Sequence, residues 1–254
     1  MSYEPADALL QNRVILITGA GDGIGRALAR RCAALGATVV LAGRTLRKLE
    51  AVYDRIEQAG GPQPAIYPIN LEGAFPKDYM DLGEVLQREF GRLDGLVHNA
   101  AVLGGLTPIA NYSVETWHRS LHVNLNAPFM LTQALLGLLN LSADASVIFT
   151  TDRVAEEGRA YWGAYAVAKG ATQSLMKVLA NELEANTPIR VNSVYPGKVR
   201  TRLRLDAYPA ADQSDWAEPE TVLAPYLYLL GPDSRGVTGR TLESADFVPP
   251  GGTV

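Results

Sequence analysis

A tyrosine and a lysine stand four residues apart in the segment YAVAK at 165–169. Residues at this spacing lie on one face of an α-helix, so Tyr165 and Lys169 are expected to be neighbours. A free phenol has a pKa of about 10, and a nearby ammonium group stabilises the phenolate and lowers that pKa. The spacing therefore predicts proton-transfer chemistry, with Tyr165 as general acid/base and Lys169 as its electrostatic partner.

A carboxylate complicates this pair, because Asp152 precedes Tyr165 by thirteen residues in the segment FTTDR at 149–153. An ionised carboxylate only accepts hydrogen bonds, so it repels a developing oxyanion instead of stabilising it. One unit charge at ~4 Å and an effective dielectric of ~20 is worth ~4 kcal/mol. Asp152 is therefore a candidate catalytic residue that could cancel the benefit Lys169 gives Tyr165.

A glycine-rich segment, TGAGDGIGRALA, follows the apolar run VILIT at 14–18. Glycines between a strand and a helix let the backbone turn tightly and approach a diphosphate, which rests on the helix N-terminus. The strand and helix on either side make the motif more specific than glycines alone. Gly19, Gly23 and Gly25 are therefore candidate cofactor-binding residues.

Short apolar segments rich in β-branched residues alternate with helical patterns along the chain. Strands are expected at 14–18, 38–42, 65–69, 93–98, 146–150, 189–195 and 240–244, and helices at about 24–35, 45–59, 76–90, 113–139, 163–186 and 219–230. This alternation indicates an α/β fold whose sheet is parallel and covered on both faces. Right-handed crossovers then predict a doubly wound, Rossmann-type sheet of seven strands. We see no linker or repeat and expect a single domain over 1–254.

The longest irregular stretch runs over 197–218. A loop of this length inside a compact domain is usually functional, and its place after the sixth strand predicts a substrate lid.

Composition and charge exclude several classes of function. The net charge of the 254 residues is −4 and no basic block occurs, which argues against a nucleic-acid partner. The N-terminus lacks an apolar signal core and no apolar run is long enough to span a bilayer, so we expect a cytoplasmic protein without a membrane role. The single cysteine, Cys32, excludes a Cys-rich metal site. His118 and His122 lack a third ligand in a recognisable pattern, and no metal is expected.

Five motifs in order resemble the short-chain dehydrogenase/reductase family: TGxxxGIG at 18–25, HNAA at 98–101, VNLNAPF at 123–129, YxxxK at 165–169 and YPGKVRT at 195–201. The resemblance covers the chain from Val14 to about Glu243. Two further segments, GRAYWGAYA and LYLLGPDSRGVTG, are similar to a bacterial branch of oxidoreductases whose substrate the resemblance does not supply. The resemblance implies hydride transfer between a nicotinamide cofactor and a small carbonyl or alcohol substrate, in a homodimer or homotetramer.

The resemblance also implies roles for individual residues. Lys169 would hold the nicotinamide ribose in addition to its role beside Tyr165, and Asn124 would position a water in the proton relay. The further positions that it places in the cofactor site are Ile24, Asn70, Asn99, Pro196 and Gly197.

The end of the second expected strand bears on the choice of cofactor. Enzymes that prefer NAD usually carry an acid there, to bind the ribose 2′-hydroxyl. This chain has Gly43 followed by Arg44, whose guanidinium can pair with a 2′-phosphate through two hydrogen bonds. Asp22, in the glycine-rich turn, would weakly repel that phosphate. We expect NADP(H) in preference to NAD(H).

In the family, the position of Asp152 is a serine that hydrogen-bonds the substrate oxygen, and three readings of the departure follow. In the first, Thr150 or Thr151 takes the serine's role and Asp152 pairs with Arg153 or Arg159. In the second, the carboxylate recognises a cationic or donor-rich substrate. In the third, hydride transfer is weak or absent and the chain is an NADP(H)-binding protein. Retention of the tyrosine, the lysine and the asparagine favours an enzyme.

Overall fold

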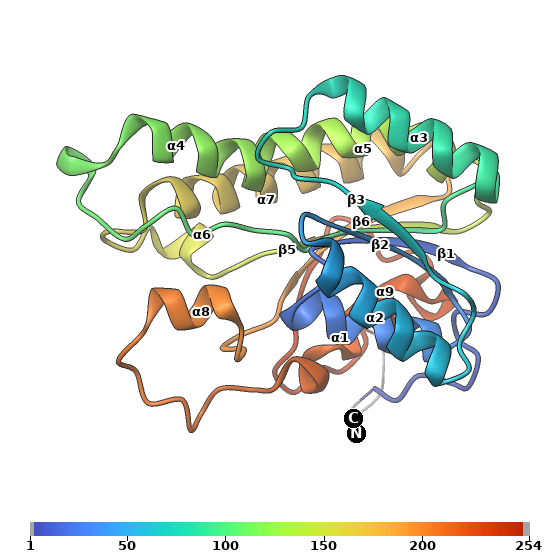
Figure 1. Cartoon of the computed structure of the whole chain (residues 1–254). Helices are drawn as coiled ribbons and strands as arrows, with labels where there is room; N and C mark the ends of the chain where they lie inside the picture. Colours follow the sequence, from blue (N-terminus) through green and yellow to red (C-terminus); the bar gives the residue numbers. More distant parts are fainter. Residues whose placement is uncertain (1–2, 251–254) are drawn as a thin grey trace.

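The computed structural model describes residues 3–250 of the chain (Figure 1). Within these residues seven strands form one sheet, and every pair of neighbouring strands is parallel. The strands are β1 (Val14–Thr18), β2 (Thr38–Gly43), β3 (Ala65–Pro68), β4 (Gly95–His98), β5 (Ala145–Thr150), β6 (Ile189–Tyr195) and β7 (Thr241–Glu243). Their order is β3-β2-β1-β4-β5-β6-β7, so the winding reverses between β1 and β4. Ligands of such sheets bind at the carboxyl ends of the strands beside this reversal.

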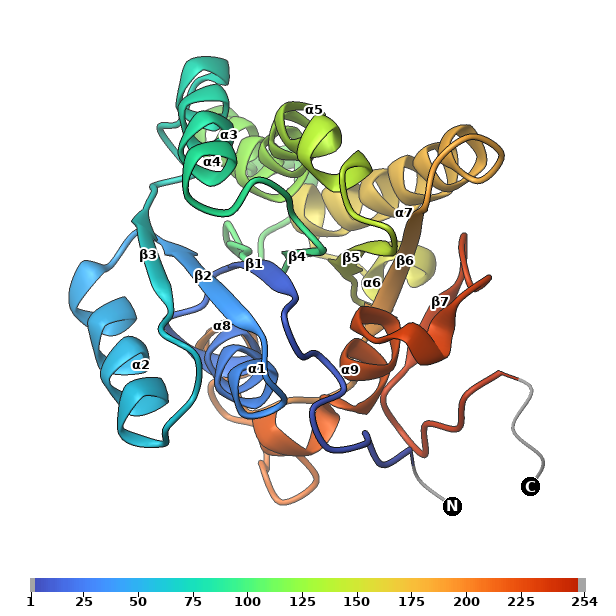
Figure 2. The same cartoon turned by 90° about the vertical axis from the view of Figure 1, so that its right-hand side faces the viewer.

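Helices cover both faces of the sheet (Figure 2). One face carries α3 (Pro76–Phe90), α4 (Val114–Leu121), α5 (Ala127–Asn140) and α7 (Gly163–Leu183), and the other carries α1 (Gly23–Ala34), α2 (Leu46–Gln58) and α9 (Ala224–Leu230). Two clusters of buried apolar side chains correspond to these two layers. β1 is buried along its whole length, as a strand between two helical layers requires. The predicted doubly wound fold is confirmed.

The expected helix over 113–139 is interrupted. α4 ends at Leu121, a π-helical turn follows over His122–Asn126, and α5 begins at Ala127. Pro128 has no N–H, so the backbone carbonyl of Asn124 lacks the donor that an α-helix supplies from four residues further on. Because apolar periodicity continues through the turn, the sequence pattern does not reveal it.

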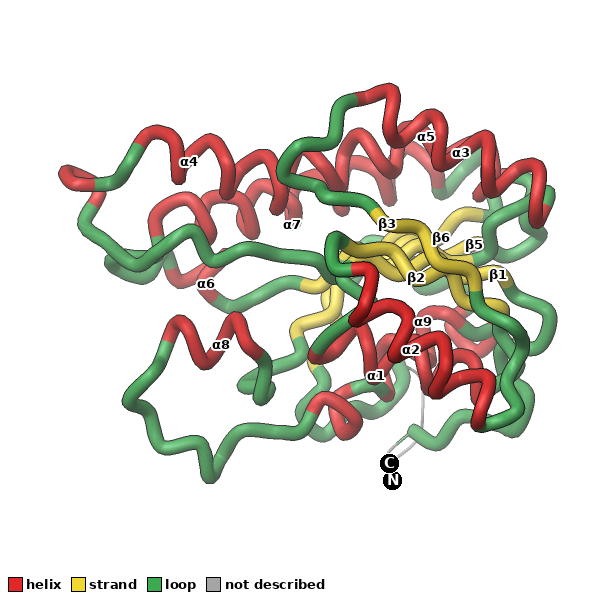
Figure 3. Tube along the Cα trace, in the orientation of Figure 1, coloured by secondary structure: helices red, strands yellow, loops and turns green. Residues whose placement is uncertain are grey.

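The segment over 197–218 is less irregular than expected. It contains the short helix α8 (Arg202–Ala207), which is preceded by a short loop and followed by a longer one (Figure 3). The Thr201 hydroxyl caps this helix by accepting a hydrogen bond from the Arg204 N–H at 3.3 Å. Ala207 is buried in a small apolar cluster with Trp162 and Tyr165. A capped helix of six residues, with only Leu203 and Ala207 in apolar contacts, is too short for periodicity to predict.

Buried charges lie at the amino ends of the strands. Asp144 accepts hydrogen bonds from the Arg190 guanidinium at 2.8 and 3.0 Å and pairs with Arg13 at 3.2 Å. Asp94 accepts from the Val14 N–H at 2.8 Å and has further donors in nearby side chains. We call Arg13, Asp94, Asp144 and Arg190 the amino-end charge network. These interactions tie the starts of β1, β4, β5 and β6 together.

Candidate active site

The glycine-rich turn connects β1 to α1. Gly19 and Gly23 have φ angles of +68° and +47°, a region that favours glycine. A Cβ on Gly25 would lie 2.3 Å from the Gly19 carbonyl oxygen, so the helix can begin this close to the turn only with glycine there. Ile24 is buried beneath the turn. Apart from that of Gly23, which donates to the Asp22 carboxylate, the backbone N–H groups in the first turn of α1 suit an anion such as a diphosphate.

Asn99 joins this turn to the loop after β4. Its side-chain amide donates to the Thr18 carbonyl at 3.1 Å, and its backbone N–H donates to the Thr18 hydroxyl at 3.0 Å. Asn99 therefore fixes the wall of the expected cofactor site through two contacts with the end of β1. On the far side, β6 ends at Tyr195 and the chain turns through Pro196, which is buried, and Gly197, which has a φ of +81°.

The carboxylate of Asp22, in the turn, has two partners. It accepts a hydrogen bond from the Gly23 N–H at 2.8 Å and pairs with the Lys48 ammonium at 2.6 Å. The hydrogen bond from Lys48 is the largest cause that lowers the pKa of Asp22. The expected repulsion of a phosphate is therefore offset by Lys48, a residue that sequence reasoning missed because it follows in the next helix.

Arg44 and Asn70 lie at the ends of the neighbouring strands β2 and β3. The Arg44 side chain is 65% exposed and its only carboxylate neighbour among residues 3–250 is Glu72, at 4.0 Å. Asn70 is exposed, and its side-chain oxygen accepts from the Glu72 N–H at 3.3 Å. Arg44 therefore keeps most of its donors free at the edge of the site.

Tyr165 and Lys169 are both buried on α7, with exposed fractions of 4% and 5%. The Lys169 nitrogen lies 5.6 Å from the centre of the Tyr165 ring and donates to the Thr150 carbonyl, at the end of β5, at 2.7 Å. The expected pairing of the two side chains on one helix face is thus present. The Thr150 contact anchors Lys169 to the carboxyl end of the sheet.

The pKa values of the pair differ from the expectation that Lys169 lowers that of Tyr165. Burial, followed by the charge of Asp152, raises the pKa of Tyr165 well above its ordinary value. Burial lowers the pKa of Lys169 to about 8, and the charge of Asp152 partly offsets this. The pKa of Tyr165 is thus determined by desolvation and by the Asp152 carboxylate, and the Lys169 ammonium does not bring it below its ordinary value.

Asn124 lies in the π-helical turn and is 2% exposed. Its amide group donates to the Val102 carbonyl at 2.8 Å and to the Ser120 hydroxyl at 3.1 Å, and its side-chain oxygen accepts from the Val102 N–H at 3.0 Å. The side chain is therefore occupied in holding the loop after β4. The amide group of the side chain is thus engaged within the protein, and Pro128 removes the regular helical donor to the Asn124 backbone carbonyl.

The two threonines before Asp152 differ in their contacts. The Thr150 hydroxyl hydrogen-bonds to the hydroxyl of Tyr226, on α9, at 3.0 Å and is not free for a substrate. The Thr151 hydroxyl is buried and has no hydrogen-bond partner among the described residues. Of the two candidates for the serine's role, only Thr151 has a hydroxyl that is not already hydrogen-bonded within the described residues.

The arginine partners expected for Asp152 are engaged elsewhere. Arg153 pairs with Glu243 at 2.9 Å, and Arg159 donates to the Tyr208 hydroxyl at 2.6 Å. That part of the first reading is wrong, because both side chains find partners that are distant in sequence. Asp152 accepts a backbone hydrogen bond from Val154 at 3.2 Å, and its charge acts on Tyr165 and Lys169. The carboxylate thus contributes to the electrostatics of the site.

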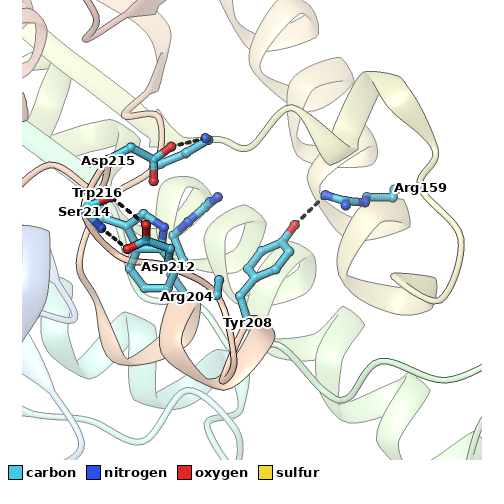
Figure 4. Close-up of a pocket in the computed structure, with 9 residues that line it drawn as sticks. Arg159, Arg204, Tyr208, Asp212, Ser214, Asp215 and Trp216 are labelled. Atoms are coloured by element: carbon cyan, nitrogen blue, oxygen red, sulfur yellow. Dashed lines mark hydrogen bonds and ion pairs between the residues drawn. The ribbon is translucent and has the colours of Figure 1, made fainter.

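Two pockets are found, and Tyr165 and Lys169 line neither of them. The larger, of about 450 Å³, is lined by Arg159, Lys198, Arg204, Tyr208, Ala211, Asp212, Ser214, Asp215 and Trp216 (Figure 4). The smaller, of about 290 Å³, is lined by Thr151, Asp152, Arg153, Glu156, Glu157, Gln173, Tyr195, Thr241 and Glu243. All but one of the residues of the first pocket come from the segment over 197–218. The second pocket has more carboxylates than cations.

The described residues contain no group of three or more His, Cys, Asp or Glu side chains that could hold a metal ion. His122 lies in the π-helical turn, 3.2 Å from the Ala74 carbonyl oxygen. In residues 3–250 every helix falls short of the length and apolar character needed to cross a lipid bilayer.

Comparison with known proteins supplies the context of this site. The model of the short chain dehydrogenase family matches residues 13–211. The Escherichia coli K12 protein named uncharacterized oxidoreductase YciK is 41% identical over 251 residues, 99% of each chain. A solved short chain dehydrogenase from Pseudomonas syringae is 50% identical, with a TM-score of 0.94 over 96% of this chain and 99% of that one. A structure from Shigella flexneri 2a, complexed with NADP, is 41% identical, with a TM-score of 0.92 over 94% of this chain and 100% of that one.

Proposed function

Because this chain belongs to the short chain dehydrogenase family, a family of oxidoreductases, we propose that it transfers a hydride between NADP(H) and a carbonyl or alcohol substrate, with Tyr165 as the general acid/base. One observation carries this proposal: Tyr165 and Lys169 are buried together on α7, and Lys169 is anchored to the end of β5. This end of the sheet also holds the glycine-rich turn, which follows β1.

The residues around the turn fit a phosphorylated dinucleotide. The N-terminus of α1 and the glycines before it suit the diphosphate, and the exposed guanidinium of Arg44 suits a 2′-phosphate. The NADP complex of the Shigella flexneri relative supports the same choice. When bound, the cofactor supplies or accepts the hydride. Lys48 adds positive charge beside Asp22, which further favours NADP(H) over NAD(H).

The chain's own residues handle the proton. In carbonyl reduction, the Tyr165 hydroxyl donates its proton to the substrate oxygen, and the Lys169 ammonium stabilises the phenolate that is left. The backbone carbonyl of Asn124, without a helical donor because of Pro128, holds the water through which that proton is replaced. The Thr151 hydroxyl takes the serine's role at the substrate oxygen, and the absence of a partner for it among the described residues supports this.

Burial and the charge of Asp152 determine the protonation state of Tyr165 in this proposal. Alcohol oxidation requires the phenolate of Tyr165, which burial and Asp152 disfavour. Carbonyl reduction begins from the neutral phenol, which they favour. At neutral pH Tyr165 is therefore held in the protonated form from which carbonyl reduction starts.

The charge of Asp152 near Tyr165 also favours a second candidate, an NADP(H)-binding protein of low activity, because this carboxylate opposes negative charge on the substrate oxygen. The test follows NADPH oxidation with a panel of aldehydes and ketones, in the wild type and in Tyr165→Phe. An enzyme should turn over at least one compound, and Tyr165→Phe should lose about 100-fold or more in kcat while still binding NADPH. Tight NADPH binding with no turnover across the panel would establish the second candidate.

Two further proposals concern the whole chain. We propose a single domain in which the segment over 197–218 closes over the substrate, since that segment lines the larger pocket. We also propose self-association through the long helices, where Phe129, Val167 and Val178 are about half exposed. Light scattering on the purified protein tests the second point, and a monomeric mass would contradict it. Cytoplasmic location stays a prediction.

A further inference from the structure

We infer that Arg204, on the lid helix α8, receives an oxyanion group of the substrate, so that the enzyme acts on carbonyl compounds that carry a carboxylate or a phosphate. This inference rests on the proposed function and adds the substrate class to it. The observations that support it are the contacts of Arg204, its position relative to Tyr165 and the pairing of the other charges in the pocket.

Arg204 differs from the other arginines of its segment. Arg200 pairs with Glu218 at 3.1 Å and Arg202 pairs with Asp206 at 2.9 Å. Arg204 has no carboxylate partner among residues 3–250, and its Nε is buried without a hydrogen bond to any of them. A buried guanidinium N–H without an acceptor carries an uncompensated desolvation cost.

Two aromatic rings fix the position of this guanidinium. Its central carbon lies 4.9 Å from the centre of the Tyr208 ring and 5.3 Å from that of Trp216. Figure 4 shows Tyr208 standing between Arg204 and Arg159 across the pocket. A planar cation held against aromatic faces is preorganised for the two parallel hydrogen bonds that a carboxylate or phosphate accepts.

Arg204 is also close to the reacting centre. Trp162 packs against both Tyr165 and Tyr208, with 5.7 Å between ring centres in each case. The charge of Arg204 lowers the pKa of Tyr165, against the larger effects of burial and Asp152. One substrate molecule can thus place an anionic group at Arg204 and its carbonyl group at Tyr165.

The carboxylates of the pocket do not compensate Arg204. Asp215 forms an ion pair with Lys198, and Asp212 accepts two hydrogen bonds from Ser214, both at 2.9 Å. The remaining cation of the pocket, Arg159, donates to the Tyr208 hydroxyl at 2.6 Å. The pocket therefore presents a net positive wall in which Arg204 is the donor that lacks an acceptor among the described residues.

The kinetic test uses matched carbonyl compounds that are neutral, carboxylated or phosphorylated. Arg204→Gln should lower kcat/KM by about 10- to 100-fold for the charged compounds, mainly through KM, and by less than about threefold for the neutral one. Arg202→Gln is the matched control, because Arg202 is exposed on the same helix and already paired. Equal losses on neutral and charged compounds, or a wild-type preference for cationic compounds, would overturn the inference.

A binding test separates this inference from the proposed function. With saturating NADPH, malonate or inorganic phosphate at tenfold excess over its Kd should raise the Tm of the wild type by about 3 °C relative to potassium chloride of equal ionic strength. The rise should vanish in Arg204→Gln and persist in Arg202→Gln. A response to malonate alone identifies a carboxylate and a response to phosphate alone a phosphate; no response to either overturns the inference. A response in a protein without turnover would contradict the proposed function and leave the anion site standing.

Discussion

Both ends of the sheet bury charged side chains, but the two ends differ in how these charges are paired. At the amino ends of the strands, Asp144 lies between Arg190 and Arg13, and all three side chains are largely buried. At the carboxyl ends, Lys169 makes one hydrogen bond to a backbone carbonyl, and Arg204 has no carboxylate partner within residues 3–250. Asp152 receives one backbone hydrogen bond.

This difference separates charges that hold the fold from charges that are available to ligands. A buried ion pair is costly to break, since the partner left behind has lost its hydration. A buried charge with unused hydrogen-bonding capacity carries part of that cost in the folded chain, and a bound ligand can offset it. The amino-end network should therefore control stability, and the carboxyl-end charges should control binding and rate.

The largest expected effect is on stability, at the amino end. Asp144→Ala leaves Arg190 and Arg13 without their shared carboxylate, and should lower the free energy of unfolding by about 3–5 kcal/mol. For a chain of this size, that lowers the Tm by roughly 6–20 °C in a thermal melt. Asp152→Ala is the matched control and should change the Tm by less than about 2 °C. A Tm loss in the control as large as that in Asp144→Ala would break the comparison.

The next effect is on cofactor binding, at the carboxyl end. Arg44→Ala removes hydrogen bonds to a 2′-phosphate and should raise the Kd of NADPH by about 10- to 100-fold, with less than a threefold change for NADH. Fluorescence titration with both cofactors measures this. Arg47→Ala, which removes an exposed arginine from the start of α2, provides the control. Equal weakening for NADPH and NADH would remove Arg44 from the 2′-phosphate site.

Asp152→Ser should raise the reduction of simple neutral carbonyl compounds by tenfold or more, equivalent to about 1.4 kcal/mol. The serine adds a second donor beside the Thr151 hydroxyl at the substrate oxygen and removes a repelling charge. Steady-state kcat/KM with NADPH measures it, and the Tm is followed in parallel. An unchanged or lower rate would assign the carboxylate a dedicated role in recognising the substrate.

The smallest effect is on pH dependence. Burial lowers the pKa of Lys169 to about 8, so carbonyl reduction should decline as the pH rises through about 8 and the ammonium loses its proton. Asp152 raises the pKa of Lys169, so Asp152→Asn should move the decline to lower pH. The profile of kcat against pH for both proteins measures this shift. A decline at the same pH in both would show that the two groups do not interact.

The sequence predicted the parts of this molecule that depend on local pattern. The seven expected strand segments became the seven strands, and those in the middle of the sheet, such as β1, β4 and β5, are the buried apolar runs that the pattern identifies most clearly. The spacing of Tyr165 and Lys169 predicted their shared helix face, since helix geometry alone determines it. The Arg44 position followed from its place at the end of β2.

Other features depend on contacts between segments that are distant in sequence. The Lys48 partner of Asp22 lies 26 residues away, and nothing in the local pattern selects it. The raised pKa of Tyr165 comes from burial and from Asp152, two effects that act through the folded structure. Arg204 is one of the arginines of the segment RTRLRL at 200–205, and only its contacts distinguish it from Arg202.

The π-helical turn at His122–Asn126 also constrains how this chain can vary in length. Deleting one residue from the turn would let the backbone return to regular α-helical bonding, but successive residues of a helix are about 100° apart around its axis. The whole of α4 would then rotate by that amount relative to α5 and turn the side that it packs against α7 away from it. We therefore expect insertions and deletions to be selected against in this turn.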